Sequence, residues 1–181
     1  MTGRAAEVLA LARSRPPTLG AGRLVAVDGP AGSGKTTLAA EVGSLAGAPV
    51  LHLDDLYPGW GGLPEVDPMV LGVLEPLAAG RRGRYRRYDW CAGAYAEARE
   101  VEPVPLLVLE GVGAGNRAWA PLITTLVWVE AAPDLRQARA LARDGDALRD
   151  HWDAWTRDEA RLFAEQDTRA RADLVVRTDA D

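Results

Sequence analysis

Several residue types are scarce in this chain of 181 residues, and each scarcity excludes a class of protein. The only cysteine, Cys91, excludes an internal disulfide bond and a cysteine-rich metal cluster. No apolar run approaches the roughly 20 residues that a membrane-spanning helix needs. The formal net charge of −5 disfavours binding to nucleic-acid backbones. We therefore expect a protein without membrane or nucleic-acid partners.

The N-terminal segment does not have the order of a secretory signal. It is amphipathic, and Arg13 and Arg15 follow its apolar stretch instead of preceding it. A hydrophobic fraction of 48% supplies a core, and the length is typical of one compact domain. We expect a single domain over residues 1–181 in a reducing, cytoplasmic compartment. The composition leaves the oligomeric state open.

Lysine is almost absent. Of the 21 basic side chains, 20 are arginine, and Lys35 is the only lysine. Arginine replaces lysine on most protein surfaces, but not where a compact ammonium group on a flexible stem must reach between phosphates. The position of Lys35 therefore indicates a site where the two side chains are not interchangeable.

Lys35 stands in a glycine-rich segment with the spacing of a phosphate-binding P-loop, Gly29-Pro30-Ala31-Gly32-Ser33-Gly34-Lys35-Thr36. The glycines allow successive backbone N–H groups to turn toward phosphate oxygens, and the helix expected to begin near Lys35 adds its positive end. We predict that this loop, together with Thr37, binds ATP. Lys35 is expected to act as a catalytic group on the β- and γ-phosphates, and the Thr36 hydroxyl to ligate Mg²⁺.

Apolar runs typical of buried strands alternate with segments of helical periodicity. The expected strands are 24–27, 50–53, 106–109, 125–129 and 174–176, and the expected helices are 3–14, 36–46, 67–79, 134–143 and 147–166. The segment 81–100 is rich in arginine and aromatic residues, with strand-like pieces near 85–88. This alternation predicts an α/β fold whose parallel sheet is covered by helices on both faces.

The scarcity of asparagine and lysine narrows the class of P-loop protein. A GTPase normally carries an Asn-Lys-x-Asp motif, and neither Asn116 nor Lys35, each the only residue of its type, stands in one. The larger remodelling ATPases need more chain. A small-molecule kinase fits the length, and it requires an acceptor pocket, an acid that orients the acceptor hydroxyl, and a mobile basic lid.

Acidic residues follow two of the expected strands. Asp54 and Asp55 end the second strand, where ligand crevices form in open α/β sheets, and Tyr57 and Trp60 follow at a spacing typical of a pocket. One of these carboxylates is predicted to accept the proton of the acceptor hydroxyl or to help hold Mg²⁺; the alternative is a pair of turn residues. Glu110 ends a later strand and is predicted to organise the metal; the alternative is a solvated strand end.

A mixture of rings and guanidinium groups over residues 85–90 is a candidate acceptor site. This combination suits a planar ring substrate through stacking and polar edge contacts. A half-buried strand with basic outer residues has the same composition, so both interpretations stay open. His52 and His151 have no partners at metal-ligand spacing, and no chemistry is predicted for them.

Three arginines of an expected helix are candidates for the lid. Arg136, Arg139 and Arg143 share one helical face and precede a turn at 144–146, where a lid over about 143–150 is expected to hinge. There they would stabilise the charge of a transferred phosphoryl group. The alternative is salt bridging on a solvated helix.

Four later runs follow the P-loop in a definite order: Asp54-Asp55-Leu56-Tyr57, Tyr88-Asp89-Trp90, Leu109-Glu110-Gly111, and the pattern from Asp134-Leu135-Arg136 to Arg143-Asp144. In this order, over residues 23–177, the chain resembles the uridine kinase-like branch of the P-loop nucleoside and nucleotide kinases. The resemblance implies a P-loop NTPase three-layer sandwich with a five-stranded parallel sheet in the order 2-3-1-4-5 and a small helical lid. It also implies ATP- and Mg²⁺-dependent transfer of a phosphoryl group to a nucleoside 5′-hydroxyl.

The resemblance assigns roles to individual residues. Asp54 matches the family's general base, Arg143 falls in the lid as a catalytic arginine, and Glu110 matches the acid on the strand beside the P-loop strand. The residues expected to contact the acceptor are Asp55, Tyr57, Tyr88, Trp90 and Arg139.

Two departures from the family pattern leave the acceptor open. Cys91-Ala92-Gly93 stands where uridine kinases carry a histidine that helps to read the pyrimidine, and the lid lacks a dense arginine run. One alternative is a kinase for another small hydroxyl compound, or for a nucleoside monophosphate with a second phosphate site at 81–87. Another alternative, from a different class of protein, is an ATP-binding regulator with little turnover.

Overall fold

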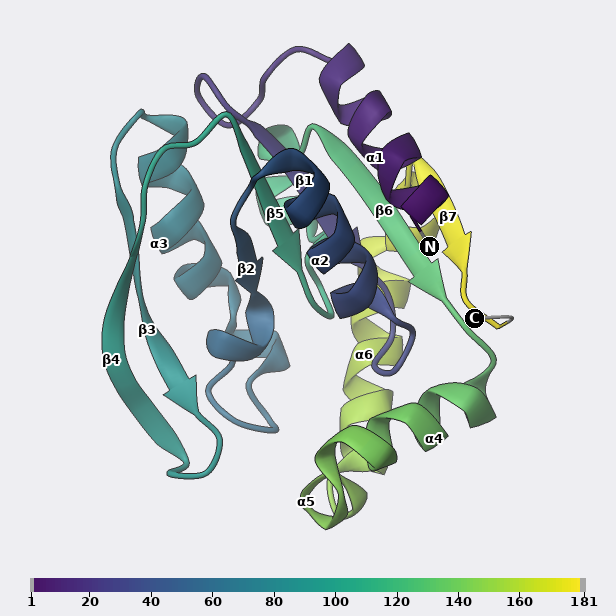
Figure 1. The fold of residues 1–181 in the computed structure, drawn as a ribbon. Coiled ribbons are helices and arrows are strands. Elements are labelled where there is room, and N and C mark those ends of the chain that lie inside the picture. The colour runs from purple at the N-terminus through teal and green to yellow at the C-terminus, as the bar shows by residue number, and fades with distance from the viewer. Residues whose placement is uncertain (1, 180–181) are drawn as a thin grey trace.

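Five short strands form a parallel sheet at the centre of the structure, a computed structural model that describes residues 2–179 (Figure 1). They are β1 (Arg23–Asp28), β2 (Val50–His52), β5 (Leu106–Glu110), β6 (Thr125–Glu130) and β7 (Leu174–Arg177). The strands lie in the order β2-β5-β1-β6-β7, and each neighbouring pair is parallel. Numbered along the chain as parallel strands, this is the order 2-3-1-4-5, which confirms the predicted fold class.

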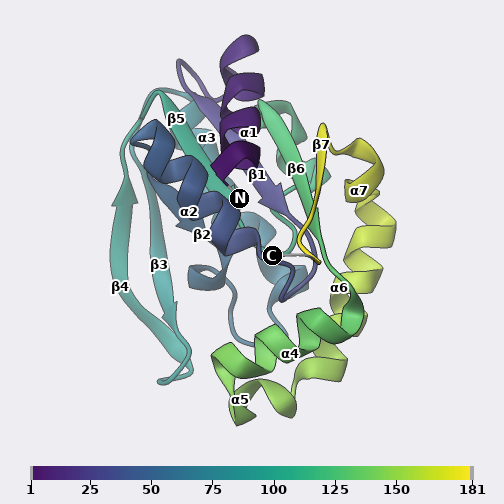
Figure 2. The same cartoon turned by 45° about the vertical axis from the view of Figure 1, so that its right-hand side comes forward.

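Helices cover both faces of the sheet because its inner strands are apolar on both sides. On one face, α1 (Thr2–Ser14) and α2 (Lys35–Ala46) pack against Val25 and Val27 of β1. The intervening apolar residues of β1 belong to the core on the other face, which α3 (Asp67–Ala78) covers. The sheet therefore lies between two helical layers, as Figures 1 and 2 show from two sides.

A separate antiparallel hairpin, β3 (Gly83–Asp89) and β4 (Ala94–Val101), lies beside the sheet (Figure 1). The sequence predicted strand-like pieces here without the return strand. Gly83 lies so close to α3 that an added Cβ atom would stand 2.6 Å from the backbone oxygen of Val73. The tip of the hairpin lies at the end of the molecule where the parallel strands finish.

Three helices form an arm at the same end of the molecule (Figures 1 and 2): α4 (Pro133–Asp144), α5 (Asp146–Arg149) and α6 (Trp152–Gln166). The prediction of one helix over 147–166 is wrong, because the chain is interrupted between α5 and α6. Leu148 and Trp152 form a small apolar cluster with Ala140 of α4. The folding of α5 back onto α4 thus overrides the helical periodicity of the sequence.

Short helical turns complete the chain: η1 (Leu53–Asp55), η2 (Leu63–Glu65), η3 (Arg117–Leu122) and α7 (Thr168–Arg171). Within residues 2–179, none of the helices combines the length and the apolar character needed to cross a bilayer.

Candidate active site

The P-loop joins β1 to α2, in the strand–loop–helix context that the motif requires. Its backbone needs glycine at Gly29, Gly32 and Gly34, whose φ angles are 142°, 75° and 93°. A Cβ atom on Gly29 or Gly32 would lie only 2.0 or 2.2 Å from the backbone oxygens of Val129 and Arg136. The loop is therefore pressed between β6 and α4.

Lys35 and Thr36 occupy the first turn of α2. The Lys35 ammonium group donates a hydrogen bond of 3.0 Å to the carbonyl of Pro30, and it is almost fully buried. The Thr36 hydroxyl lies 3.3 Å from each carboxylate oxygen of Glu110, the last residue of β5. This places the predicted phosphate-binding and metal-binding groups in one site.

The donor set fits a Mg²⁺ ion that arrives with a nucleotide. Magnesium is usually held by one or two carboxylates together with substrate phosphates and water. Thr36 and Glu110 supply a hydroxyl and a carboxylate of this kind. In the part of the chain that the structure describes, no group of three or more His, Cys, Asp and Glu side chains is placed to hold a metal ion. The site therefore suits an ion that is bound jointly by the protein and a nucleotide, and not an ion that is held by protein ligands alone.

A buried ion pair fixes the backbone of Ala31 from outside the loop. Glu159 of α6 accepts the Ala31 N–H at 2.9 Å, and Arg136 of α4 donates to the Ala31 carbonyl at 3.1 Å. The two side chains meet at 3.1 Å, and Glu159 is only 3% exposed. Two helices of the arm thus hold the P-loop. No motif marks Glu159, and the sequence did not predict its role.

The structure places Arg139, which was predicted to contact the acceptor, outside the lining of the cleft described below. Its guanidinium group donates to the hydroxyl and the carbonyl of Thr178 at 3.0 and 2.8 Å. The Thr178 hydroxyl in turn donates to the carbonyl of Ser33 in the P-loop at 2.8 Å. Arg139 therefore braces the loop from outside the cleft described below, because the helical face that it shares with Arg136 packs against the loop.

Asp28, at the end of β1, ties the P-loop to the segment after β5. Its carboxylate is fully buried and accepts the N–H groups of Gly29, Gly113 and Gly115 at 2.7, 2.8 and 2.8 Å. Burial raises the pKa of Asp28 to about 6, although the three hydrogen bonds favour its charged form. The side chain thereby shapes the segment 111–115, whose first residues line the cleft.

A cleft of about 610 Å³ opens between the P-loop, the hairpin tip and the arm. The sequence-predicted residues that line it are Ala31, Gly32, Lys35, Thr36, Asp54, Asp55, Trp60, Tyr88, Trp90, Glu110 and Arg143. The lining residues for which no role was predicted include His52, Cys91, Asp144 and Trp155. The cleft thus brings together residues predicted for the nucleotide, the metal and the acceptor, whereas Gly29, Pro30, Ser33, Gly34, Thr37, Tyr57 and Arg139 do not line it.

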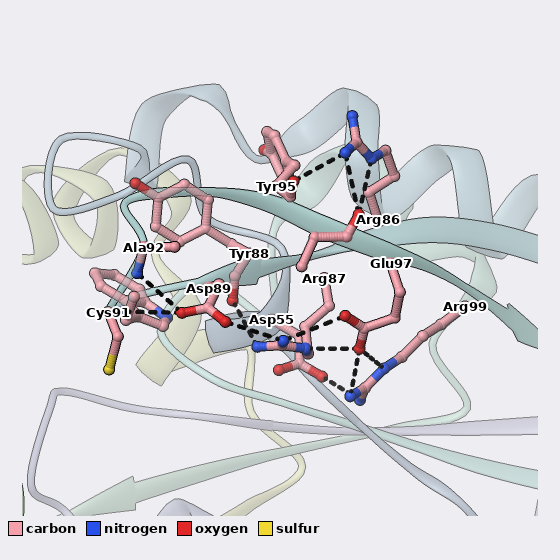
Figure 3. Close-up of polar contacts among 12 residues, drawn as sticks. Asp55, Arg86, Arg87, Tyr88, Asp89, Cys91, Ala92, Tyr95, Glu97 and Arg99 are labelled. Carbon is pink, nitrogen blue, oxygen red and sulfur yellow. Dashed lines mark hydrogen bonds and ion pairs between the residues drawn. The ribbon is translucent and has the colours of Figure 1, made fainter.

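Asp55 belongs to an ion-pair network of the hairpin. Its carboxylate lies 3.2 Å from Arg99 of β4, and Arg99 also contacts Glu97. Arg87, which reaches the cleft, is held by Glu97 at 2.8 Å and by Asp89 at 3.2 Å (Figure 3). Asp55 is therefore engaged in joining the hairpin to the end of β2.

Asp54 has different surroundings from those of Asp55. Among the described residues, no side chain forms an ion pair or hydrogen bond with its carboxylate, which faces the cleft. Desolvation by the surrounding protein raises the pKa of Asp54, and the charge of Glu110 raises it further, while Arg143 and Lys35 oppose both effects. Of the two neighbouring carboxylates, only that of Asp55 is thus engaged by a described side chain.

Aromatic rings from three parts of the chain form one wall of the cleft. Trp90 of the hairpin meets Trp60 at a centroid distance of 4.8 Å and Tyr88 at 5.4 Å, both edge to face. Trp60 meets Trp155 of α6 edge to face at 6.1 Å, and the His151 ring stacks on Trp60 at 5.0 Å. The wall therefore joins the hairpin, the loop after β2 and the arm.

Tyr57 lies beneath this wall and does not line the cleft. It is fully buried, its hydroxyl donates to the carbonyl of Val112 at 2.6 Å, and its ring meets Trp155 at 5.3 Å. Tyr57, which was predicted to contact the acceptor, is thus placed in the core and away from the cleft. Spacing along the sequence placed it near the pocket, but only the packing shows that its side chain points into the core.

Two further polar contacts flank the cleft. Arg143, at the end of α4, forms a forked contact with Asp144 in which both hydrogen bonds are 2.7 Å long. His52, for which no chemistry was predicted, lies 2.6 Å from Glu110. This hydrogen bond raises the pKa of the His52 imidazole. The contact depends on the pairing of β2 with β5, which no local sequence signal reveals.

The fold of this chain is similar to that of several solved structures described as kinases. A solved structure described as a "Possible Uridine Kinase" from Bacillus stearothermophilus matches with a TM-score of 0.65 over 94% of this chain and 98% of its own, at 18% identity. A "putative fructose transport system kinase" from Silicibacter sp. TM1040 matches with a TM-score of 0.55 over 93% and 98%, at 23% identity. D-glycerate 3-kinase from Cryptococcus neoformans matches with a TM-score of 0.54 over 91% of this chain and 86% of its own, at 16% identity.

These similarities concern the fold. No family model and no curated protein matches the sequence.

Proposed function

We propose that this chain is a kinase that transfers the γ-phosphoryl group of ATP to a hydroxyl group of a small acceptor with a planar ring, such as a nucleoside. The observation that carries the proposal is that the P-loop and Asp54 line one cleft, with Asp54 within electrostatic reach of Lys35. The similarity to solved kinases supports phosphoryl transfer as the reaction.

The nucleotide half of the cleft is built to bind a triphosphate. Backbone N–H groups of the P-loop and the positive end of α2 attract the phosphates, and Lys35 reaches the β- and γ-phosphates. Thr36 and Glu110 would hold Mg²⁺, which when bound neutralises charge on the phosphates. Glu159 and Arg136 keep the loop in shape from outside.

Asp54 acts as the base in the proposed reaction. The acceptor oxygen forms a bond to the γ-phosphorus, the bond from that phosphorus to the bridging oxygen of ADP breaks, and the acceptor proton passes to the Asp54 carboxylate. The raised pKa of Asp54 brings it closer to the working pH, which favours proton transfer. Arg143 lines the same cleft and is placed to stabilise charge on the moving phosphoryl group.

The charges near the aromatic wall support an uncharged acceptor. A nucleoside monophosphate needs a second phosphate site, but four of the five arginines over residues 81–87 are already engaged. Arg82 and Arg84 pair with Glu100, Arg86 donates to backbone carbonyls of β4, and Arg87 lies between two carboxylates (Figure 3). The ring-lined wall favours a planar group by stacking or edge contacts.

An ADP-release assay tests the proposal. ATP and Mg²⁺ are combined with nucleosides, nucleoside monophosphates, sugars and hydroxy acids, and we expect the highest turnover with a nucleoside. Lys35→Ala should remove turnover while the circular dichroism spectrum stays unchanged. A clear preference for a sugar, a hydroxy acid or a monophosphate would correct the acceptor class. Stabilisation by ATP without turnover on any acceptor would instead support a nucleotide-binding regulator.

A further inference from the structure

His52 and Glu110 are partners in the parallel register between β2 and β5, so their side chains leave the sheet side by side. Nδ1 of His52 lies 2.6 Å from Oε1 of Glu110. An ionised carboxylate only accepts hydrogen bonds, so the imidazole nitrogen is the donor. The contact is therefore a short hydrogen bond to a charged acceptor, a strong type.

The same carboxylate meets Thr36 through both of its oxygens, each at 3.3 Å. Glu110 is only 3% exposed, and a buried carboxylate is costly to keep charged without hydrogen-bond donors. β5 lies between β2 and the P-loop strand β1. His52 thus holds the carboxylate from one side, while Thr36 approaches it from the side of the P-loop.

We propose that His52 is a positioning residue of the Mg²⁺ site, a role that rests on the proposed function. It keeps the Glu110 carboxylate turned toward Thr36, in the arrangement that suits an ion shared with a nucleotide. His52 stands two residues before Asp54, at the start of the turn η1. One strand end therefore carries both the anchor of the metal-binding acid and the base.

Two substitutions separate this role from simple packing. His52→Ala removes the donor, whereas His52→Asn keeps a side-chain N–H close to the position of Nδ1. His151→Gln is the matched control, because His151 is the only other histidine and its ring stacks on Trp60, not on Glu110.

The first readout is thermal stabilisation by ADP as Mg²⁺ is added. Removal of a residue that orients a metal ligand commonly weakens metal binding 10- to 100-fold. We expect His52→Ala to need roughly tenfold more Mg²⁺ than wild type, with His52→Asn and His151→Gln close to wild type. Stabilisation by ADP in the presence of EDTA should be equal in all four proteins. A wild-type Mg²⁺ requirement in His52→Ala, or equal impairment in His52→Asn, would overturn the proposal.

The second readout uses neither turnover nor a His52 variant. In magnesium-free His151→Gln, His52 is the only histidine, and its two ring nitrogens are resolved by ¹⁵N NMR. We expect a proton on Nδ1 that exchanges slowly with water; an unprotonated Nδ1 would overturn the proposal. If Mg²⁺ and ADP fail to stabilise wild type at all, the proposed function itself fails. If they do stabilise it and His52→Ala shares its Mg²⁺ requirement, only the role of His52 is lost.

Discussion

The indole N–H of Trp90 donates a hydrogen bond of 2.9 Å to the backbone carbonyl of Asp54. Two further contacts from the hairpin reach the next two residues: Arg99 pairs with the Asp55 carboxylate, and the Tyr95 hydroxyl donates to the carbonyl of Leu56 at 3.1 Å. The hairpin thus holds three successive residues after β2. The position of the candidate base depends on a segment more than 30 residues away in sequence.

Trp90→Phe tests whether this contact positions the base. The substitution keeps an aromatic ring and removes the donor, and one hydrogen bond is worth about 0.5–1.5 kcal/mol. We expect kcat to fall by up to about tenfold, with the KM for ATP unchanged. Trp128→Phe is the control, because it removes an indole hydrogen bond to Glu130 outside the cleft. An equal fall of kcat in both variants would contradict the positioning role.

Asp54→Asn and Asp55→Asn separate the two neighbouring carboxylates. Because Asp54 is unpaired among the described side chains and Asp55 is held by Arg99, we expect Asp54→Asn to lower kcat by about 10²–10⁴-fold. Nucleotide binding, measured by thermal shift with ATP, should persist. Asp55→Asn should act mainly by loosening the hairpin, with a smaller loss of kcat. An active Asp54→Asn beside an inactive Asp55→Asn would reverse the assignment of the base.

Glu159→Ala tests the clamp on the P-loop. It leaves the guanidinium group of Arg136 without its partner in a largely buried position and frees the N–H of Ala31. Breaking such a pair on one side typically costs about 3–5 kcal/mol, so the urea midpoint and the affinity for ATP should both fall. Glu159→Gln, which still accepts from Ala31, should lose less.

Asp158→Ala is the matched control for this clamp. Asp158 precedes Glu159 on α6 and pairs with the exposed Arg161 at 3.4 Å. A surface pair of this kind contributes about 0–1 kcal/mol, so stability should barely change. Equal effects of the two alanine substitutions would show that Glu159 has no special role.

The raised pKa of Asp28 leads us to expect that the folding stability depends on pH. Its pKa of about 6 in the folded protein lies above the ordinary value of 3.8, so between these values the folded state binds a proton that the unfolded state has released. The resulting stability is present below pH 3.8 and is lost as the pH rises through 6, by up to about 3 kcal/mol.

The measurement is urea unfolding of wild type and Asp28→Asn between pH 4 and 7. Asparagine does not titrate here, so the difference in unfolding free energy between the two proteins isolates the contribution of Asp28. We expect the variant to be less stable, because its amide N–H₂ opposes one of the backbone N–H groups that the carboxylate accepts. The stability advantage of wild type should shrink as the pH rises. A constant difference would show that the pKa of Asp28 is not raised.

The local features of this protein are encoded in short stretches of its sequence. The glycine positions and Lys35 define a P-loop because its backbone conformation and phosphate chemistry involve neighbouring residues only. Apolar runs that alternate with segments of helical periodicity predict the layered parallel sheet, because the pattern of each strand and helix lies within its own residues. The break between α5 and α6 is not encoded in this way. The sequence there has the periodicity of one continuous helix, but the folding of α5 onto α4 overrides it.

Tertiary structure alone decided which side chains meet in the cleft. Asp54 and Asp55 are chemically identical neighbours, and only the folded hairpin engages one and leaves the other available. Tyr57 is buried because of what packs around it, and His52 reaches Glu110 because β2 pairs with β5 in one register. Such contacts join residues that are distant in sequence, so no local pattern encodes them.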